Sequence, residues 1–319
     1  DRHVYAGSFS LNGNGEMTGI LWVEESGLLS TPIALTNTHS VGVARDALIS
    51  YYFNHHPESP VRWMMPVVAE TWDGYLNDIN GMHVKPEHVF RALDSAATGP
   101  VAEGAVGGGT GMTAYEFKGG IGTSSRRVSL GGREYVLGAL VQANYGRRYQ
   151  LTVDGVPVGR QITVREVPGR ADLPPVEAAP GQGPARRRES HEGSLIAVIA
   201  TDVPLLPDQC KRLARRAGHG LARVGSFAAD TSGDIFLAFS TGNDIPRDAG
   251  QSAGRAFAVA TIDHESMSLL FEAVMESVEE SVLNALCAAT TVTGIRGHTM
   301  HALPLERLQQ VLKDHGAGR

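Results

Sequence analysis

The sequence predicts a single α+β domain that spans residues 1–319. Strand-like and helix-like stretches follow one another irregularly, without the repeated strand–helix–strand order of a doubly wound sheet. Hydrophobic residues form 42% of the chain, which is enough for a sizeable core. The apolar strands after residue 193 are too few to cover one another, so we expect them to complete a core begun by the first part of the chain.

Before residue 168 the hydrophobic patterns predict five strands and two helices. The helices are expected at 40–52 and at 86–97, where Pro86 occupies a first-turn position and Gly99 follows the end. The strands are expected at 18–25, 63–71, 112–118, 123–130 and 134–144.

Residues 168–193 are rich in Pro, Gly, Ala and charged side chains and have no apolar period. Because such a stretch buries too little surface to offset the entropy of ordering it, we expect a mobile linker that crosses the surface. The apolar run 194–201 follows at once and is typical of a strand buried on both faces. This abrupt change marks the bond between Gly193 and Ser194.

After that bond, Pro207 opens a basic helix that we expect to run to residue 217, with Gly218 and Gly220 ending it. The remaining elements are predicted to be strands at 234–240 and 256–262 and amphipathic helices at 264–289 and 304–314.

Composition argues against several classes of protein. The net charge of −6 offers no electrostatic reason to expect a nucleic-acid partner. There is no apolar run long enough for a transmembrane helix, so we expect no membrane partner. Cys210 and Cys287 have apolar neighbours in helical patterns and are expected to be buried free thiols. A cytoplasmic location is favoured, with the periplasm as the alternative if a signal segment precedes Asp1.

Two further motifs receive a structural interpretation. The glycine-rich residues 107–111 are not followed by a helical pattern, so we expect a tight turn rather than a dinucleotide site. His298 and His301 lack a nearby carboxylate in the sequence, and they are interpreted as exposed loop residues, as are His55 and His56. No metal ion and no organic cofactor is expected.

The bond between Gly193 and Ser194 is a candidate for self-cleavage. Gly193 has no Cβ to hinder attack by the Ser194 hydroxyl on the preceding carbonyl. An N→O acyl shift followed by hydrolysis would free the α-amine of Ser194, whose pKa near 8 suits a general base for its own hydroxyl. From composition alone, a loop that simply joins a core strand remains the simpler explanation.

Eight motifs then narrow the interpretation. In this order they resemble the DmpA/BapA family of L-aminopeptidase/D-esterases and β-peptidyl aminopeptidases, which is peptidase family S58, and the resemblance extends from about residue 7 to about residue 300. The motifs are NGNGEMTG (12–19), LTNTHSVG (35–42), VVAETWDGYLNDING (67–81), GGGTGM (107–112), KGGIGTSSR (118–126), VQANYG (141–146), GSLIAVIATDVPL (193–205) and SGDIFLAFSTGN (232–243).

The resemblance implies a four-layer αββα sandwich of the DOM type, similar in layering to the N-terminal-nucleophile hydrolases. It also implies that the precursor splits into an α-chain, 1–193, and a β-chain, 194–319, that stay folded together. A tetramer of such αβ units is expected. The implied activity is that of a serine aminopeptidase on small peptides, amides or esters that carry a free amine.

The resemblance also assigns roles to individual residues. Ser194 is expected to be the processing site and the nucleophile, and Asn144 to donate a hydrogen bond to the oxyanion. Ser232 and Asp234 are expected to interact with the α-amine of Ser194, and Glu70 to hold the substrate's ammonium group.

One position departs from the family pattern. Some relatives have Tyr two residues after the glutamate, where this chain has Trp72, so the second oxyanion donor and the stereochemical preference stay open.

Two alternatives to the aminopeptidase function remain. The first is another amidase or acyltransferase on the same fold, similar to nylon-oligomer hydrolases or ornithine acetyltransferase, although those relatives use Thr where this chain has Ser194. The second is an unprocessed, non-enzymatic paralogue.

Overall fold

A computed structural model describes residues 2–171, 193–246 and 256–317 of the chain. Most of the predicted linker therefore lies outside the described residues, and only its two ends, 168–171 and Gly193, are described.

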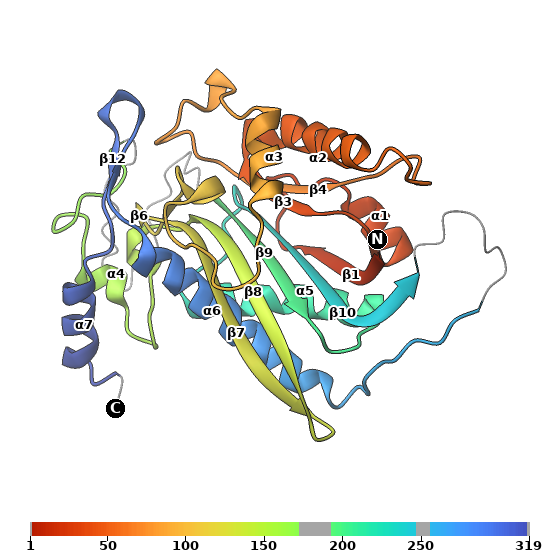
Figure 1. The fold of residues 1–319 in the computed structure, drawn as a ribbon. Coiled ribbons are helices and arrows are strands. Elements are labelled where there is room, and N and C mark those ends of the chain that lie inside the picture. Colours follow the sequence, from red (N-terminus) through yellow and green to blue (C-terminus); the bar gives the residue numbers. More distant parts are fainter. Residues whose placement is uncertain (1, 172–192, 247–255, 318–319) are drawn as a thin grey trace.

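The centre of the molecule is a mixed six-stranded sheet (Figure 1). Its parallel pair lies in the middle, and the other neighbours are antiparallel. In spatial order the strands are β2 (Leu28–Leu29), β1 (Arg2–Ser10), β10 (Gly233–Pro246), β9 (Gly193–Thr201), β8 (Arg133–Tyr145) and β7 (Gly120–Leu130).

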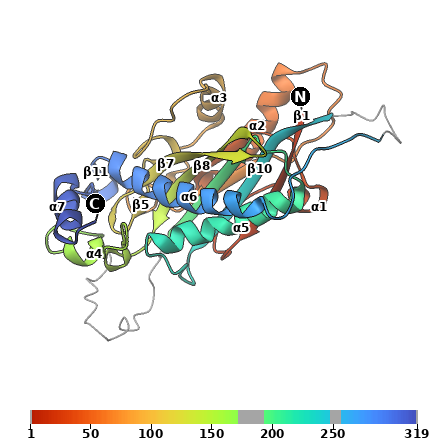
Figure 2. The same ribbon diagram turned by 90° about the horizontal axis from the view of Figure 1, so that it is seen from below.

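Three further layers complete the domain. Two long helices run side by side across one face of the sheet (Figure 2), and a two-stranded parallel sheet with two helices above it covers part of the other face (Figure 1). The first pair is α5 (Pro207–Arg223) and α6 (Met267–Ala288), the small sheet is β3 (Ile33–Asn37) and β4 (Val67–Thr71), and the outer helices are α2 (Val41–His55) and α3 (Pro86–Asp94). The order helix, sheet, sheet, helix is the one expected from the resemblance.

Two strands show why the layers form. In β9, Leu195 packs into the core below α5 and α6, while its neighbour Ile196 packs against Val67 of β4. In β4, Val67 faces the large sheet and Val68 faces α2. Because successive side chains of a strand point to opposite faces, these unbroken apolar runs require cover on both sides.

Smaller elements connect the layers. The hairpin β5 and β6 and the 3₁₀ turn η3 lie beside the start of β7, and the short pair β11 and β12 precedes the last helix. The smaller elements are α1 (Ile20–Ser26), η1 (Thr38–Ser40), η2 (Ile79–Gly81), η3 (Gly107–Gly109), β5 (Thr113–Ala114), β6 (Phe117–Lys118), η4 (Arg148–Gln150), α4 (Val158–Gln161), β11 (Val292–Thr293), η5 (Ile295–Gly297), β12 (Thr299–Met300) and α7 (Leu305–Asp314).

The predicted strand at 18–25 is wrong, because this segment forms the helix α1. Gly19 and Gly27, at φ +75° and +71°, bound the helix on both sides in the left-handed conformation. Only Val23 is buried, so the apolar run reflects a short surface helix rather than a strand with a buried face.

The predicted end of the basic helix is also wrong, since α5 continues through Gly218 and Gly220 to Arg223. A Cβ on Gly220 would lie 2.7 Å from the backbone oxygen of Met275 in α6. This glycine therefore permits close helix packing, which outweighs its helix-propensity cost of about 1 kcal/mol. The helix ends instead before Gly225, whose φ is +98°.

The predicted strand at 256–262 is not formed either. Residues 256–261 are exposed, and the segment is fixed by the side-chain amide of Asn243, which both donates to and accepts from the backbone of Ala260. The other predicted elements are confirmed with shifted ends, except that 112–118 is a hairpin of two short strands and 63–71 contains only β4. Cys210 is buried as expected, whereas Cys287 is exposed on α6.

Candidate active site

The strand register brings the predicted catalytic residues together. In the six-stranded sheet, Ser194 of β9 is the cross-strand partner of Asn144 on β8 and of Gly233 on β10. Ser232 and Asp234 flank that glycine. Ser194 is 3% exposed, so its hydroxyl lies in a site largely shielded from bulk water.

Gly193 has a conformation that suits glycine alone. Its φ is +82°, and a Cβ built there would lie 1.7 Å from the backbone oxygen of Asn144. No side chain can occupy that space unless the two strands separate. The residue before Ser194 is thus fixed by strand pairing as well as by its own backbone.

Asp234 is fully buried, and its two carboxylate oxygens differ. Oδ1 accepts hydrogen bonds from the backbone N–H of Leu195 at 3.0 Å and from the hydroxyl of Ser232 at 2.9 Å. Oδ2 is buried without a hydrogen-bond partner among the described residues. Burial raises the pKa of this carboxyl to about 6, and the polar contacts of Ser232, the backbone N–H of Leu195 and the side chain of Asn12 offset part of that shift.

Asn144 is oriented by two hydrogen bonds. Its Oδ1 accepts from the backbone N–H of Thr113 at 2.8 Å, and its Nδ2 donates to the backbone oxygen of Trp72 at 2.6 Å. A backbone N–H can only donate and a carbonyl can only accept, so the amide has one possible orientation. Nδ2 carries a second hydrogen that these bonds leave for another acceptor.

Glu70 lies at the end of β4, in the smaller sheet above Ser194's strand, and is 2% exposed. Its Oε1 accepts from the backbone N–H of Glu16 at 2.9 Å, and its Oε2 accepts from the hydroxyl of Thr38. Burial raises the pKa of the Glu70 carboxyl despite these bonds. A Cβ on Gly15 would lie 3.1 Å from Oε1 and 3.3 Å from the Cα of Gly233, so Glu70 is close to the strand partner of Ser194.

Trp72 contributes its backbone carbonyl to the site, through the bond to Asn144. Its ring is half-buried and packs with the cluster of Tyr75, Leu76 and Met300. The guanidinium of Arg170 lies 5.3 Å from the centre of the indole ring. The first residues of the predicted linker therefore dock beside Trp72.

The other candidate motifs have structural roles. Residues 107–109 form the 3₁₀ turn η3, which leads into β5 rather than into a helix, as expected for a tight turn. His298 is half-buried rather than exposed, since its ring stacks on Tyr75 and its Nδ1 bonds the backbone oxygen of Tyr75 at 2.8 Å. His301 is half-buried as well, whereas His55 and His56 are exposed. Within the described residues there is no cluster of three or more potential metal ligands.

Sequence reasoning missed several residues that hold the site. The side chain of Asn12 accepts from the backbone N–H of Asp234 at 2.9 Å and donates to the backbone oxygen of Ala229 at 2.8 Å. Thr38 and Lys118 are further examples. All three lie inside motifs that carry the family resemblance, and this membership is the sequence signal that could have marked them as site residues. Their long-range contacts are not visible in the sequence.

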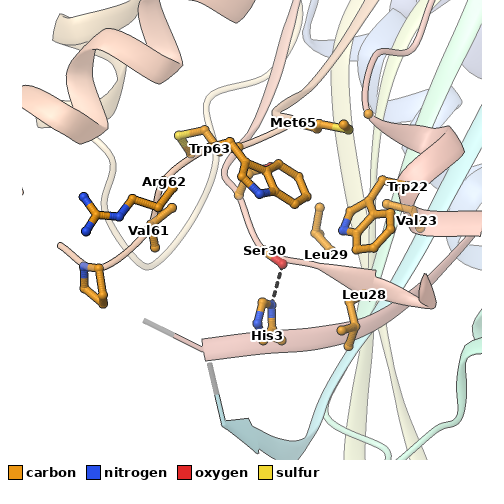
Figure 3. A pocket seen from close by; sticks show the side chains of 14 residues that line it. His3, Trp22, Val23, Leu28, Leu29, Ser30, Val61, Arg62, Trp63 and Met65 are labelled. Carbon is orange, nitrogen blue, oxygen red and sulfur yellow. Dashed lines mark hydrogen bonds between the residues drawn. The ribbon is translucent and has the colours of Figure 1, made fainter. Parts of the chain in front are cut away.

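A separate cavity of about 430 Å³ lies away from this site (Figure 3). Trp22 and Trp63 meet edge to face across it with ring centres 5.8 Å apart, and His3 bonds Ser30 at its floor. Ser10 of β1 pairs with Ile235, next to Asp234, and His3 lies seven residues further along this strand, which is roughly 23 Å at ~3.3 Å per residue. Among the described residues that line the cavity, none is a predicted site residue.

No helix in the described ranges is sufficiently long and apolar to span a membrane.

Comparison with known proteins identifies the family of this chain. The model of peptidase family S58 matches residues 1–300. A curated beta-peptidyl aminopeptidase, BapA from Sphingosinicella microcystinivorans, is 47% identical over 312 residues, covering 98% of this chain and 76% of that protein. BapA from Sphingosinicella xenopeptidilytica is 43% identical over 311 residues, covering 97% of this chain and 75% of that protein.

Solved structures agree as well. A beta-aminopeptidase from a Burkholderia species is 48% identical with a TM-score of 0.88, covering 100% of this chain and 84% of that one. The L-aminopeptidase D-Ala-esterase/amidase of Ochrobactrum anthropi, described as a variant of the Ntn hydrolase fold, is 43% identical with a TM-score of 0.86, covering 99% of this chain and 82% of that one. The chain therefore belongs to peptidase family S58 and is an aminopeptidase of the N-terminal-nucleophile serine type.

Proposed function

We propose that this chain cleaves itself between Gly193 and Ser194 and that Ser194 then acts as the nucleophile on substrates with a free N-terminal amine. The main support is the second carboxylate oxygen of Asp234. It is buried and unpartnered among the described residues, while the first oxygen is bonded to the backbone of Leu195, next to Ser194. Cleavage would create an α-ammonium group at Ser194, which is the kind of partner that a buried carboxylate requires.

In the self-cleavage step, the Oγ of Ser194 attacks the carbonyl carbon of Gly193. The C–N bond breaks, the nitrogen takes a proton, and Gly193 becomes an ester on Ser194. Water then hydrolyses this ester and leaves a carboxylate on Gly193 and a free amine on Ser194. The products are the α-chain 1–193 and the β-chain 194–319.

In the catalytic cycle, the Oγ of Ser194 attacks the carbonyl carbon of the substrate's first residue, and the new amine removes the proton from Oγ. The free hydrogen of Asn144 Nδ2 stabilises the negative charge that appears on the carbonyl oxygen. The leaving amine departs with a proton, and water releases the acyl group from Ser194. Asp234 and Ser232 orient the amine throughout.

Glu70 is proposed to recognise the substrate's ammonium group. It is a buried carboxylate whose present partners, Thr38 and the backbone of Glu16, are neutral donors. A cationic partner gives a charge-assisted hydrogen bond about twice as strong as a neutral one. Two relatives are named for β-aminopeptidase activity and one for L-aminopeptidase and D-Ala-esterase/amidase activity, so β-aminoacyl substrates are proposed first, followed by L-residues and D-alanyl esters or amides. A tetramer of αβ units is proposed for the assembly.

The test is a panel of L-, D- and β-aminoacyl anilides given to wild-type protein and to Ser194→Ala. The proposal requires hydrolysis by the wild type, none by the variant, and none of the same anilides after N-acetylation. Transfer of the acyl group to an added amine without any hydrolysis would instead favour the acyltransferase alternative. A wild-type protein that cleaves none of the panel would contradict the proposal.

A further inference from the structure

Lys118, the last residue of β6, is a fully buried lysine next to the site. Its Nζ donates three hydrogen bonds, to the backbone oxygens of Gly109 at 2.9 Å, Met112 at 2.7 Å and Gly119 at 2.8 Å. In the part of the chain that the structure describes, it makes no salt bridge. Three carbonyl dipoles therefore hold the ammonium group without a counter-charge.

Such a placement is costly for a group whose only task is to fill space. Burial lowers the pKa of Lys118 to about 7, which reflects the loss of hydration by the charged form. A methionine of similar length would fill the same volume without that loss. The charge and its three N–H donors thus require an explanation beyond packing.

The bond to Met112 leads directly to Asn144. The carbonyl of Met112 and the N–H of Thr113 belong to one peptide group, and this N–H donates to Oδ1 of Asn144 at 2.8 Å. Lys118 Nζ, the 112–113 peptide and the Asn144 side-chain amide therefore form a continuous chain of hydrogen bonds. Its last donor is Nδ2, on the residue paired with Ser194.

This chain has two physical effects. Nζ ties the end of η3 to the two residues that flank the β5–β6 hairpin, Met112 and Gly119, so the Thr113 N–H is held in place. A cation on the carbonyl of an amide also polarises the N–H at its other end, and the same polarisation passes through the second amide. Both effects make Nδ2 a better-placed and stronger donor.

We propose that Lys118 is a positioning residue for the oxyanion donor, which acts on the reaction through the 112–113 peptide and Asn144. This inference rests on the proposed function of Asn144 and adds a residue to which neither the family resemblance nor the comparisons give a role.

The test is a double-mutant cycle of Lys118→Met and Asn144→Ala, with hydrolysis of an aminoacyl anilide and the rate of self-cleavage as readouts. Removal of one oxyanion donor lowers kcat by about 100- to 1000-fold. We expect Lys118→Met to lower kcat by roughly 10- to 100-fold with KM changed little, because the substrate's ground state does not contact Lys118. In the Asn144→Ala background the same change should cost less than about 3-fold.

Lys313→Met is the matched control, since Lys313 is exposed on α7, and it should match the wild type. Circular dichroism and melting temperature report on folding. If Lys118→Met does not fold, Lys118→Gln replaces it in the cycle, because the amide keeps neutral donors and lacks the charge. We expect reduced kcat and unchanged KM for this variant as well.

Two results would overturn the inference while the proposed function stands. One is kcat in the folded Lys118 variant within 2-fold of an active wild type. The other is a fold-loss in kcat for the double variant that equals the product of the two single fold-losses. A residue that acts independently of Asn144 would give that result. An inactive, uncleaved wild type would instead overturn the proposed function and this inference with it.

Discussion

Asp234 and Glu70 are two buried carboxylates of one site, and they are held differently. Asp234 belongs to the six-stranded sheet, and among the described residues its Oδ1 accepts hydrogen bonds while its buried Oδ2 has no partner. Glu70 belongs to the two-stranded sheet, and each of its oxygens accepts a hydrogen bond. Burial raises the pKa of both groups.

We propose that this difference determines which cation each carboxylate binds. We propose that the unpartnered oxygen of Asp234 accepts from a group that the chain itself can generate, the α-amine of Ser194. Glu70 is already satisfied by neutral donors, so it can remain stable while the site is empty and bind a cation only when substrate arrives. Variants of the two should therefore separate self-processing from substrate recognition.

The largest effect is expected for Asp234→Asn. Without the carboxylate, the amine of Ser194 loses the group that orients it as a general base, a role worth about 100- to 10,000-fold in rate. We expect kcat to fall in that range with a smaller change in KM, measured by anilide hydrolysis. Asp230→Asn is the control, since Asp230 is an exposed residue shortly before β10, and it should leave kcat unchanged.

A smaller and different effect is expected for Glu70→Gln. Loss of a charge-assisted bond of about 2 kcal/mol should lower kcat/KM by roughly 30-fold for substrates with a free amine. Self-cleavage should proceed at the wild-type rate, because no substrate ammonium takes part in it. Equal losses in self-cleavage and hydrolysis would mean that Glu70 supports the site as a whole. Glu87→Gln, exposed on α3, is the control.

The pH dependence of stability offers a third distinction. The pKa of Asp234 is about 6 in the folded chain against an ordinary 3.8, so the native state binds more protons than the unfolded state between these values. Stability that is present at low pH is therefore lost as pH rises through this window. We expect uncleaved Ser194→Ala to lose roughly 1 kcal/mol of unfolding free energy between pH 5 and pH 7.5 relative to Ser194→Ala/Asp234→Asn. Urea titrations at the two pH values measure this; parallel curves would argue that Asp234 is not the group responsible.

The smallest effect is expected for Thr38→Val. This change removes one neutral donor from Glu70 and costs about 1 kcal/mol, which is roughly a 5-fold rise in KM. An unchanged KM in steady-state kinetics would show that the backbone of Glu16 alone is enough to hold the carboxylate.

Much of this architecture follows from local patterns in the sequence. The run at 194–201 predicts a two-sided buried strand because all its inner positions, 195–200, are apolar, and β9 confirms it. The patterns fail where tertiary contacts decide. Gly220 stays in a helix because α6 approaches it closely, and the apolar residues 256–261 stay exposed.

The site divides in the same way. Seven candidate residues could be named from motifs because their neighbours along the chain identify them, namely Gly193, Ser194, Asn144, Ser232, Asp234, Glu70 and Trp72. Thr113 and Lys118 act through backbone groups, and Asn12 contacts a residue more than two hundred positions away, so no local pattern reveals their roles.

The central claim is that Ser194 becomes a new N-terminus, and intact mass spectrometry of purified protein tests it most directly. We expect two species that correspond to residues 1–193 and 194–319, with Ser194-Leu195-Ile196 as the N-terminal sequence of the smaller one. Ser194→Ala should give one species of 33.9 kDa. A wild-type protein that persists as that single species, or a Ser194→Ala variant that still splits at this bond, would contradict the claim.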